Sequence, residues 1–207
     1  FFCSPGNGRK TAIEKGQQMK VFRFFAMAAA LTAVLLAAPA DGQAAEPTVK
    51  LETSMGDIVV QLNSRKAPLS TANFLQYVKS GFYDGTIFHR VIKGFMIQGG
   101  DPNGDGTGGS GQCIKGEFSA NNVKNSLPHT RGTISMARSQ TYNSASSQFF
   151  IMQKDTDSLN GNYAAFGNVT SGMDVVDAIC QNTPVTDSNG TVPKESQPKI
   201  SKITITD

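Results

Sequence analysis

Short segments rich in β-branched and aromatic residues, separated by glycine and polar turns, recur along most of the chain. Such segments are typical of antiparallel strands. Apolar residues follow helical spacing in two places, from Ser70 or Thr71 (the expected cap) to Gly81 and from Gly172 to Cys180. The pattern predicts one all-β-dominated domain, a closed eight-stranded antiparallel β-barrel capped by two α-helices. The expected strands are 49–53, 58–62, 86–92, 95–99, 132–137, 148–153, 164–169 and 199–206.

The N-terminal region differs from this pattern. Residues 19–44 combine a basic start, an apolar stretch from Phe24 to Ala38 and then small residues. This order is typical of a secretory signal peptide, with cleavage expected before Ala45 or one residue later. The alternative is a membrane anchor, although the apolar stretch is shorter than the roughly 20 residues that a spanning helix needs.

Residues 1–18 fit no targeting pattern, and Met19 stands directly before the signal peptide. Codons for Lys15-Gly16 can spell a purine-rich ribosome-binding sequence upstream of that methionine. We therefore interpret Met19 as the start and residues 1–18 as an untranslated leader that has been read as protein. The expected domain is 45–207, and it contains no further apolar stretch long enough to enter a membrane.

The apparent basicity of the chain comes from its N-terminal region. The whole chain has 19 basic and 16 acidic residues, of which five basic and two acidic residues lie in positions 1–45. The remainder has 14 of each, so charge gives no support for a nucleic-acid partner. Cys113 and Cys180 remain in this part. In an oxidising compartment they could form a disulfide or stay two separate buried thiols.

Several motifs with a known chemistry are present only in part. Residues 104–109 match the glycine pattern of dinucleotide sites, but no βαβ unit surrounds them. The loop from Asp101 resembles the start of a calcium-binding loop, but Gln112 stands where a bidentate glutamate is needed. No nucleophile elbow and no CxxC zinc motif occurs. The sequence therefore predicts no metal and no cofactor.

The segment 88–101, FHRVIKGFMIQGGD, is apolar enough to be buried yet carries an arginine and a glutamine. With strands at 86–92 and 95–99 joined by a turn at Lys93-Gly94, alternation places Phe88, Arg90 and Ile92 on one face. Met96 and Gln98 share a face after the turn, with Phe95 leaning over it. One wall could therefore present Arg90, Phe95, Met96 and Gln98, unless Arg90 is simply an edge residue that points to water.

This segment, followed by GTGG, SMA, SQFFI, FGNV and GMDVV in that order, resembles the cyclophilin family of peptidyl-prolyl isomerases from about residue 48 to 206. The resemblance implies a barrel of eight strands with two helices, and it places the family's functional residues by position. The catalytic arginine falls on Arg90, with Gln98 beside it. The proline pocket falls on Phe95, Met96, Phe150, Leu159 and Tyr163. The peptide groove falls on Ala137, Arg138, Gln148, Gly106 and Thr107.

Two departures from the family pattern stand out. Tyr163 replaces the pocket histidine of many eukaryotic members, as expected of bacterial periplasmic members. Ser158 replaces the tryptophan that many members place before Leu159, and that tryptophan helps to bind cyclosporin. We therefore expect weak cyclosporin binding with isomerase activity kept.

The resemblance implies that the protein accelerates rotation about X-Pro peptide bonds and assists the folding of exported proteins. The barrier to this rotation is amide resonance, which can be lowered without nucleophile, metal or cofactor. The expected partners are proline-containing unfolded or partly folded polypeptides, not nucleic acid or membrane, and the expected state is a monomer in the periplasm or outside the cell. The alternative is a chaperone that binds peptides in the same groove without turnover.

Overall fold

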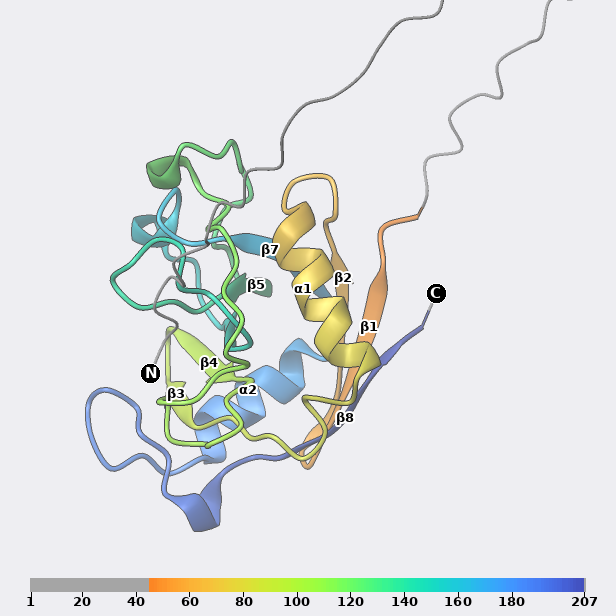
Figure 1. Ribbon diagram of the computed structural model, residues 1–207. Coiled ribbons are helices and arrows are strands. Elements are labelled where there is room, and N and C mark those ends of the chain that lie inside the picture. The colour runs from red at the N-terminus through yellow and green to blue at the C-terminus, as the bar shows by residue number, and fades with distance from the viewer. Residues whose placement is uncertain (1–44, 207) are drawn as a thin grey trace, which may run out of the picture. The chain divides into compact units, whose positions relative to one another are not determined.

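The computed structural model describes residues 45–206, so the predictions made for residues 1–44 lie outside the described residues. Each expected strand has an observed counterpart in one antiparallel sheet with the order β3-β4-β6-β5-β7-β2-β1-β8 (Figure 1). The strands are β1 (Thr48–Thr53), β2 (Gly56–Leu62), β3 (Arg90–Ile92), β4 (Met96–Gly99), β5 (Thr133–Met136), β6 (Phe149–Met152), β7 (Ala165–Ser171) and β8 (Ile200–Ile205). The helices are α1 (Pro68–Lys79) and α2 (Met173–Asn182).

The prediction of a closed barrel is wrong, because the sheet is an open half-barrel with β3 at one edge and β8 at the other. The chain before β3 was expected to be strand from residue 86, but it makes only isolated bridges, from Ile87 to Asp101 and to Lys199. The Phe88 N–H donates to the Pro198 carbonyl at 2.9 Å. Pro198 has no N–H that could donate to the Phe88 carbonyl in exchange, so a regular ladder of hydrogen bonds cannot form at this position.

Helix α1 begins earlier than its sequence suggests and is capped by a distant residue. Neither Ser70 nor Thr71 is the cap, because both are buried inside a helix that begins at Pro68. The Glu117 carboxylate accepts the Leu69 N–H at 2.9 Å and the Ser70 N–H at 2.7 Å. It also accepts the Ser70 hydroxyl at 2.7 Å. A buried anion therefore satisfies N–H groups at the positive end of the helix.

The end of α1 agrees with the prediction. Gly81 follows the Ser80 C-cap and has φ +67°, a conformation that side chains rarely adopt. The Phe82 N–H donates back to the Tyr77 carbonyl at 3.0 Å, which closes the last turn of the helix.

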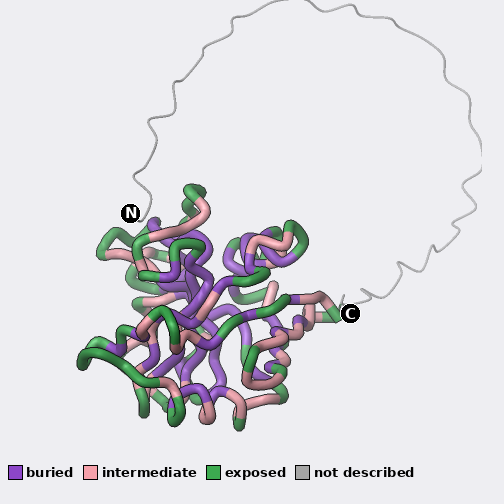
Figure 2. The backbone as a smooth tube through the Cα atoms, turned by 90° about the horizontal axis from the view of Figure 1, so that it is seen from below, coloured by how far each residue is buried: buried purple, intermediate pink, exposed green. Residues whose placement is uncertain are grey.

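The main core lies between the sheet and the two helices, where Figure 2 shows the buried backbone gathered inside the molecule. Helix α1 packs against β7 and β8, and α2 packs against β2, β3 and β4. At the centre, the Phe74 ring meets Tyr83 at 5.1 Å and Phe149 at 5.4 Å between centroids. The contact with Phe149 is edge-on, a favourable arrangement for aromatic rings, and it packs α1 against β6.

The two cysteines of the domain differ in environment. Cys180 on α2 is buried and burial raises its pKa to about 12, whereas Cys113 is exposed. No disulfide joins them within the described residues. In the same part of the chain, neither helix has the length and apolar character needed to cross a bilayer.

Candidate functional site

A pocket of about 760 Å³ opens on the outer face of β3, β4 and β6. Loops 104–107 and 189–197 form its other side. The structure brings eleven of the twelve predicted site residues to this pocket: Arg90, Phe95, Met96, Gln98, Gly106, Thr107, Ala137, Arg138, Phe150, Leu159 and Tyr163. The exception is Gln148, which is fully buried behind Gln98.

The sheet register explains why Arg90 and Gln98 lie beside an apolar surface. Arg90 stands opposite Gln98, and Gln98 stands opposite Phe150 on the next strand. Residues directly opposite each other in antiparallel strands project from the same face. A guanidinium, an amide and a phenyl ring therefore form a row across three strands. Phe88 does not share this face as predicted, because it is buried in the main core before the regular strand begins.

The apolar part of the pocket is a second hydrophobic cluster, separate from the main core. Phe150 is its buried base, and the Tyr163 ring meets it edge-on with centroids 5.7 Å apart. The cluster consists of Ile92, Phe95, Met96, Ala137, Phe150, Met152, Leu159 and Tyr163. A concave apolar surface of this kind can hold a small ring but offers it no specific polar contact.

Arg90 is held rigidly at the edge of this cluster. Its Nη1 donates to Gln98 Oε1 at 3.1 Å, its Nε to the Asn189 carbonyl at 2.8 Å, and its Nη2 to Asn189 Oδ1 at 3.0 Å. These bonds use three of the five N–H groups of the guanidinium, and the other two have no partner among the described residues. Burial lowers the pKa of Arg90, but an arginine stays charged at neutral pH.

A chain of amides behind the pocket fixes the orientation of Gln98. Its Nε2 donates to Gln148 Oε1 at 2.9 Å. Gln148 Nε2 donates in turn to the carbonyls of Gly106 at 3.1 Å and Gly108 at 2.7 Å. Gln98 therefore presents its oxygen to Arg90, and Gln148 links this pair to the glycine-rich loop.

Sequence reasoning missed the loop that carries Asn189. The dipeptide Asn189-Gly190 is a turn signal, but nothing in it indicates a contact with a residue 99 positions earlier. The loop is held against β3 because the Val91 N–H donates to the Gly190 carbonyl at 2.8 Å. A Cβ atom at Gly190 would clash with the Val91 carbonyl, so only glycine permits this approach.

Arg138 fixes the opposite side of the pocket through its side chain. Its guanidinium carbon lies 4.6 Å from the centroid of the Tyr163 ring and 5.1 Å from those of Phe118 and Tyr142. Nε and Nη2 both donate to the Asn162 carbonyl, at 3.0 and 2.8 Å. Cation–π contact and hydrogen bonds together hold Tyr163 in place at the pocket.

Both histidines of the chain lie at or behind the pocket and are buried. His89 lines the pocket, and neither of its ring nitrogens has a partner among the described residues. The His129 ring stacks on Phe150 with centroids 6.0 Å apart, and its nitrogens lie 3.1 Å from Asn160 Oδ1 and 3.0 Å from the Ser135 hydroxyl. Burial is the main cause that lowers the pKa of each histidine.

These shifts predict that the free energy of unfolding falls in mild acid. The unfolded chain binds protons on histidine near pH 6.5, whereas the folded chain binds them only at lower pH. This contribution to stability is therefore complete above about pH 6.5 and is lost as the pH falls towards the folded pKa values. Urea midpoints between pH 5.5 and 7.5 should show the loss, and His129→Gln should reduce it. Equal midpoints across this range would contradict the prediction.

Comparison with known proteins matches the described domain almost from end to end. Residues 48–205 match the family model described as cyclophilin type peptidyl-prolyl cis-trans isomerase/CLD. A peptidyl-prolyl cis-trans isomerase of Acinetobacter baylyi is 46% identical over 68% of this chain and 74% of that protein. Peptidyl-prolyl cis-trans isomerase A of Dickeya dadantii is 45% identical over 75% of this chain and 83% of that protein.

A solved structure agrees with the fold. The cyclophilin type peptidyl-prolyl cis-trans isomerase of Cryptosporidium parvum, crystallised in the presence of the dipeptide Ala-Pro, has a TM-score of 0.69 and 35% identity. The match covers 77% of this chain and 99% of that one. With the family model and the relatives, it shows that this chain belongs to the cyclophilin-type peptidyl-prolyl cis-trans isomerases.

Proposed function

We propose that the pocket accelerates rotation about X-Pro peptide bonds, and that the protein thereby assists the folding of exported proteins. The observation that carries this proposal is a rigidly held guanidinium at the edge of an apolar pocket. Arg90 has N–H groups to offer there, beside Phe95, Met96 and Phe150. Neither feature alone would suit this reaction.

The chemistry requires both features. An X-Pro bond rotates slowly because amide resonance produces a barrier of about 20 kcal/mol. The apolar cluster holds the proline ring, while the carbonyl before it turns. Arg90 donates to the prolyl nitrogen, whose lone pair becomes an acceptor only when resonance is broken. This bond is stronger in the twisted state than in either planar state, so it lowers the barrier.

The substrates we propose are proline-containing unfolded or partly folded polypeptides. The Cryptosporidium parvum relative was crystallised in the presence of Ala-Pro, which supports a proline ligand for this pocket. Residues beyond the proline would contact Ala137, the backbone of Arg138, and the loop at Gly106 and Thr107, which all line the pocket. Gln148 would act through Gln98, because it is buried.

We further propose that the protein is of the bacterial periplasmic type, and works as a monomer after removal of a signal peptide. The signal-like composition of residues 19–44 and Tyr163 in the pocket support this assignment. N-terminal sequencing of the protein from a periplasmic fraction should find a start at Ala45 or Glu46. A start at Met19 would favour the membrane anchor instead.

The folding role is tested with an exported protein whose refolding is limited by a trans-to-cis prolyl bond. The mature chain should accelerate the slow refolding phase in proportion to its concentration, and Arg90→Ala should not. If both proteins raised the yield of refolding equally without changing its rate, the groove would act as a chaperone site and the proposed role would be wrong.

Cyclosporin binding should be weak and should be improved by Ser158→Trp. Ser158 directly precedes Leu159 of the pocket and offers no large apolar face to the ligand. The chain contains no tryptophan, so the introduced indole would report binding through its own fluorescence. Inhibition of the parent protein at nanomolar cyclosporin would contradict this prediction.

A further inference from the structure

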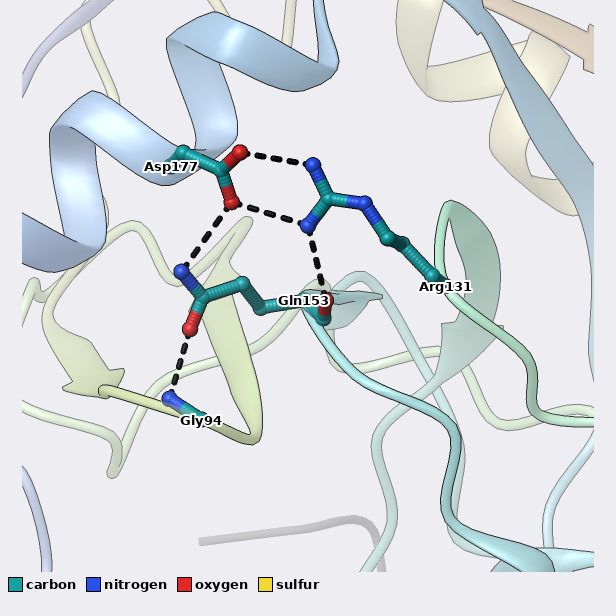
Figure 3. Close-up of polar contacts among 4 residues, drawn as sticks. All are labelled: Gly94, Arg131, Gln153 and Asp177. Carbon is teal, nitrogen blue, oxygen red and sulfur yellow. Dashed lines mark hydrogen bonds and ion pairs between the residues drawn. The ribbon is translucent and has the colours of Figure 1, made fainter.

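The turn between β3 and β4 contacts both the pocket and a polar network outside it. Phe95, at the exit of this turn, lines the pocket, and its carbonyl accepts the Gln153 N–H at 2.8 Å. The Gly94 N–H donates to Gln153 Oε1 at 2.6 Å. Figure 3 shows the Gln153 side chain extending to Gly94 on one side and to Asp177 on the other.

The two partners of Gln153 leave its amide only one orientation. Its Nε2 donates to Asp177 Oδ1 at 3.1 Å, and a carboxylate can only accept. The backbone N–H of Gly94 can only donate, so the amide oxygen must face Gly94. A flipped amide would lose both bonds.

Arg131 holds Asp177 in turn. Its Nη1 and Nη2 donate to the two carboxylate oxygens of Asp177 at 2.8 and 2.6 Å, and Nη1 also donates to the Gln153 carbonyl at 2.9 Å. The Arg131 guanidinium lowers the pKa of Asp177, so the carboxylate stays charged. Since Asp177 is on α2 and Arg131 precedes β5, the network connects the turn to two separate elements.

We propose that Gln153 is a positioning residue for Phe95, and that Asp177 and Arg131 act by fixing the Gln153 amide. This inference rests on the proposed use of the pocket for proline. Lys93 and Gly94 are exposed, so little packing restrains the tip of the turn. Phe95 would contact the proline ring in the planar and twisted states alike. Displacing it should therefore raise KM and leave kcat nearly unchanged.

The first test compares Gln153→Ala with Arg65→Ala as a matched control. Arg65 is an exposed side chain that pairs with Glu46 and does not line the pocket. Gln153→Ala should raise KM and the Kd of an Ala-Pro peptide about 3- to 10-fold, the effect expected for loss of the hydrogen bond that holds Gly94. Values of kcat should stay within about twofold, and Arg65→Ala should leave KM and Kd unchanged.

A pair of variants separates positioning from general destabilisation. Gln153→Glu keeps an acceptor for the Gly94 N–H but places a second carboxylate beside Asp177. The two carboxylates repel each other, so KM and Kd should again exceed those of the parent protein. Adding Asp177→Asn supplies a donor that faces the new carboxylate, but it gives up the bond from Arg131 Nη1 to the same position, so only part of the affinity should return. A purely structural role would show no such rescue. NMR shifts of the Gly94 amide and the Phe95 ring would follow the change directly.

The outcomes separate this inference from the proposed function. If the parent protein bound the peptide without turnover, the isomerase proposal would fail, while the Kd values would still test the network. If Gln153→Ala shifted the Gly94 amide but left KM and Kd unchanged, positioning by Gln153 would be disproved. If that variant failed to fold, the comparison of Gln153→Glu with the Gln153→Glu/Asp177→Asn double variant would test the inference. Equal KM and Kd values for these two variants would overturn it.

Discussion

Arg90→Ala is expected to lower kcat/KM for an X-Pro tetrapeptide by about 100-fold, the usual cost of losing one preorganised donor to the transition state. The loss should appear in kcat, because the apolar cluster that holds the proline ring remains. Gln98 keeps its bond to Gln148, so its position should not depend on the arginine. Relaxation of the peptide from cis to trans, measured at several peptide concentrations, gives kcat and KM separately.

Arg90→Lys serves as the control for charge. A lysine keeps the positive charge but cannot bond Gln98, the Asn189 carbonyl and a substrate at once in a fixed plane. Its activity should therefore remain far below that of the parent protein. Activity of either variant within about threefold of the parent would mean that the guanidinium does not stabilise the transition state.

Glu117→Ala is expected to reduce the free energy of unfolding by about 3 kcal/mol, since three charge-assisted hydrogen bonds at the start of α1 are lost. The Leu69 and Ser70 N–H groups and the buried Ser70 hydroxyl would lose their acceptor. Urea unfolding followed by circular dichroism measures the change.

Glu52→Ala is the matched control, because Glu52 is an exposed carboxylate that pairs with Lys50. It should leave the urea midpoint almost unchanged. Glu117→Gln should lie between the two, since an amide keeps one acceptor oxygen. If Glu117→Ala were as stable as the Glu52 variant, the carboxylate would not be the cap of the helix.

Local patterns predicted the strands and the core of the site, because these depend on neighbours in sequence. Alternation and turn residues located all eight strands. The turn at residues 93–95 is one residue longer than the expected Lys93-Gly94 turn, and it fixes the register of β3 and β4 so that Arg90 faces Gln98. The expected wall of Arg90, Phe95, Met96 and Gln98 is therefore confirmed as geometry.

Contacts between distant parts of the chain could not be predicted. Whether the sheet closes depended on the contact of residues 86–89 with Pro198. The start of α1 depended on Glu117, which lies 48 residues beyond Leu69. Asn189 reaches the site from a loop whose sequence signals only a turn. Gln153 was expected only as the last residue of a strand, and nothing in that pattern indicates its contact with Gly94. Propensity describes a segment by itself, whereas these residues act through partners that only the folded chain brings together.

Catalysis by the pocket is tested most directly by the cis-to-trans relaxation of an X-Pro tetrapeptide with the mature protein, measured together with peptide binding by NMR. The relaxation rate should rise linearly with protein concentration, and the proline signals should broaden through exchange on the protein. Binding of the peptide with relaxation at the uncatalysed rate would contradict it, because the pocket would then hold proline without lowering the barrier.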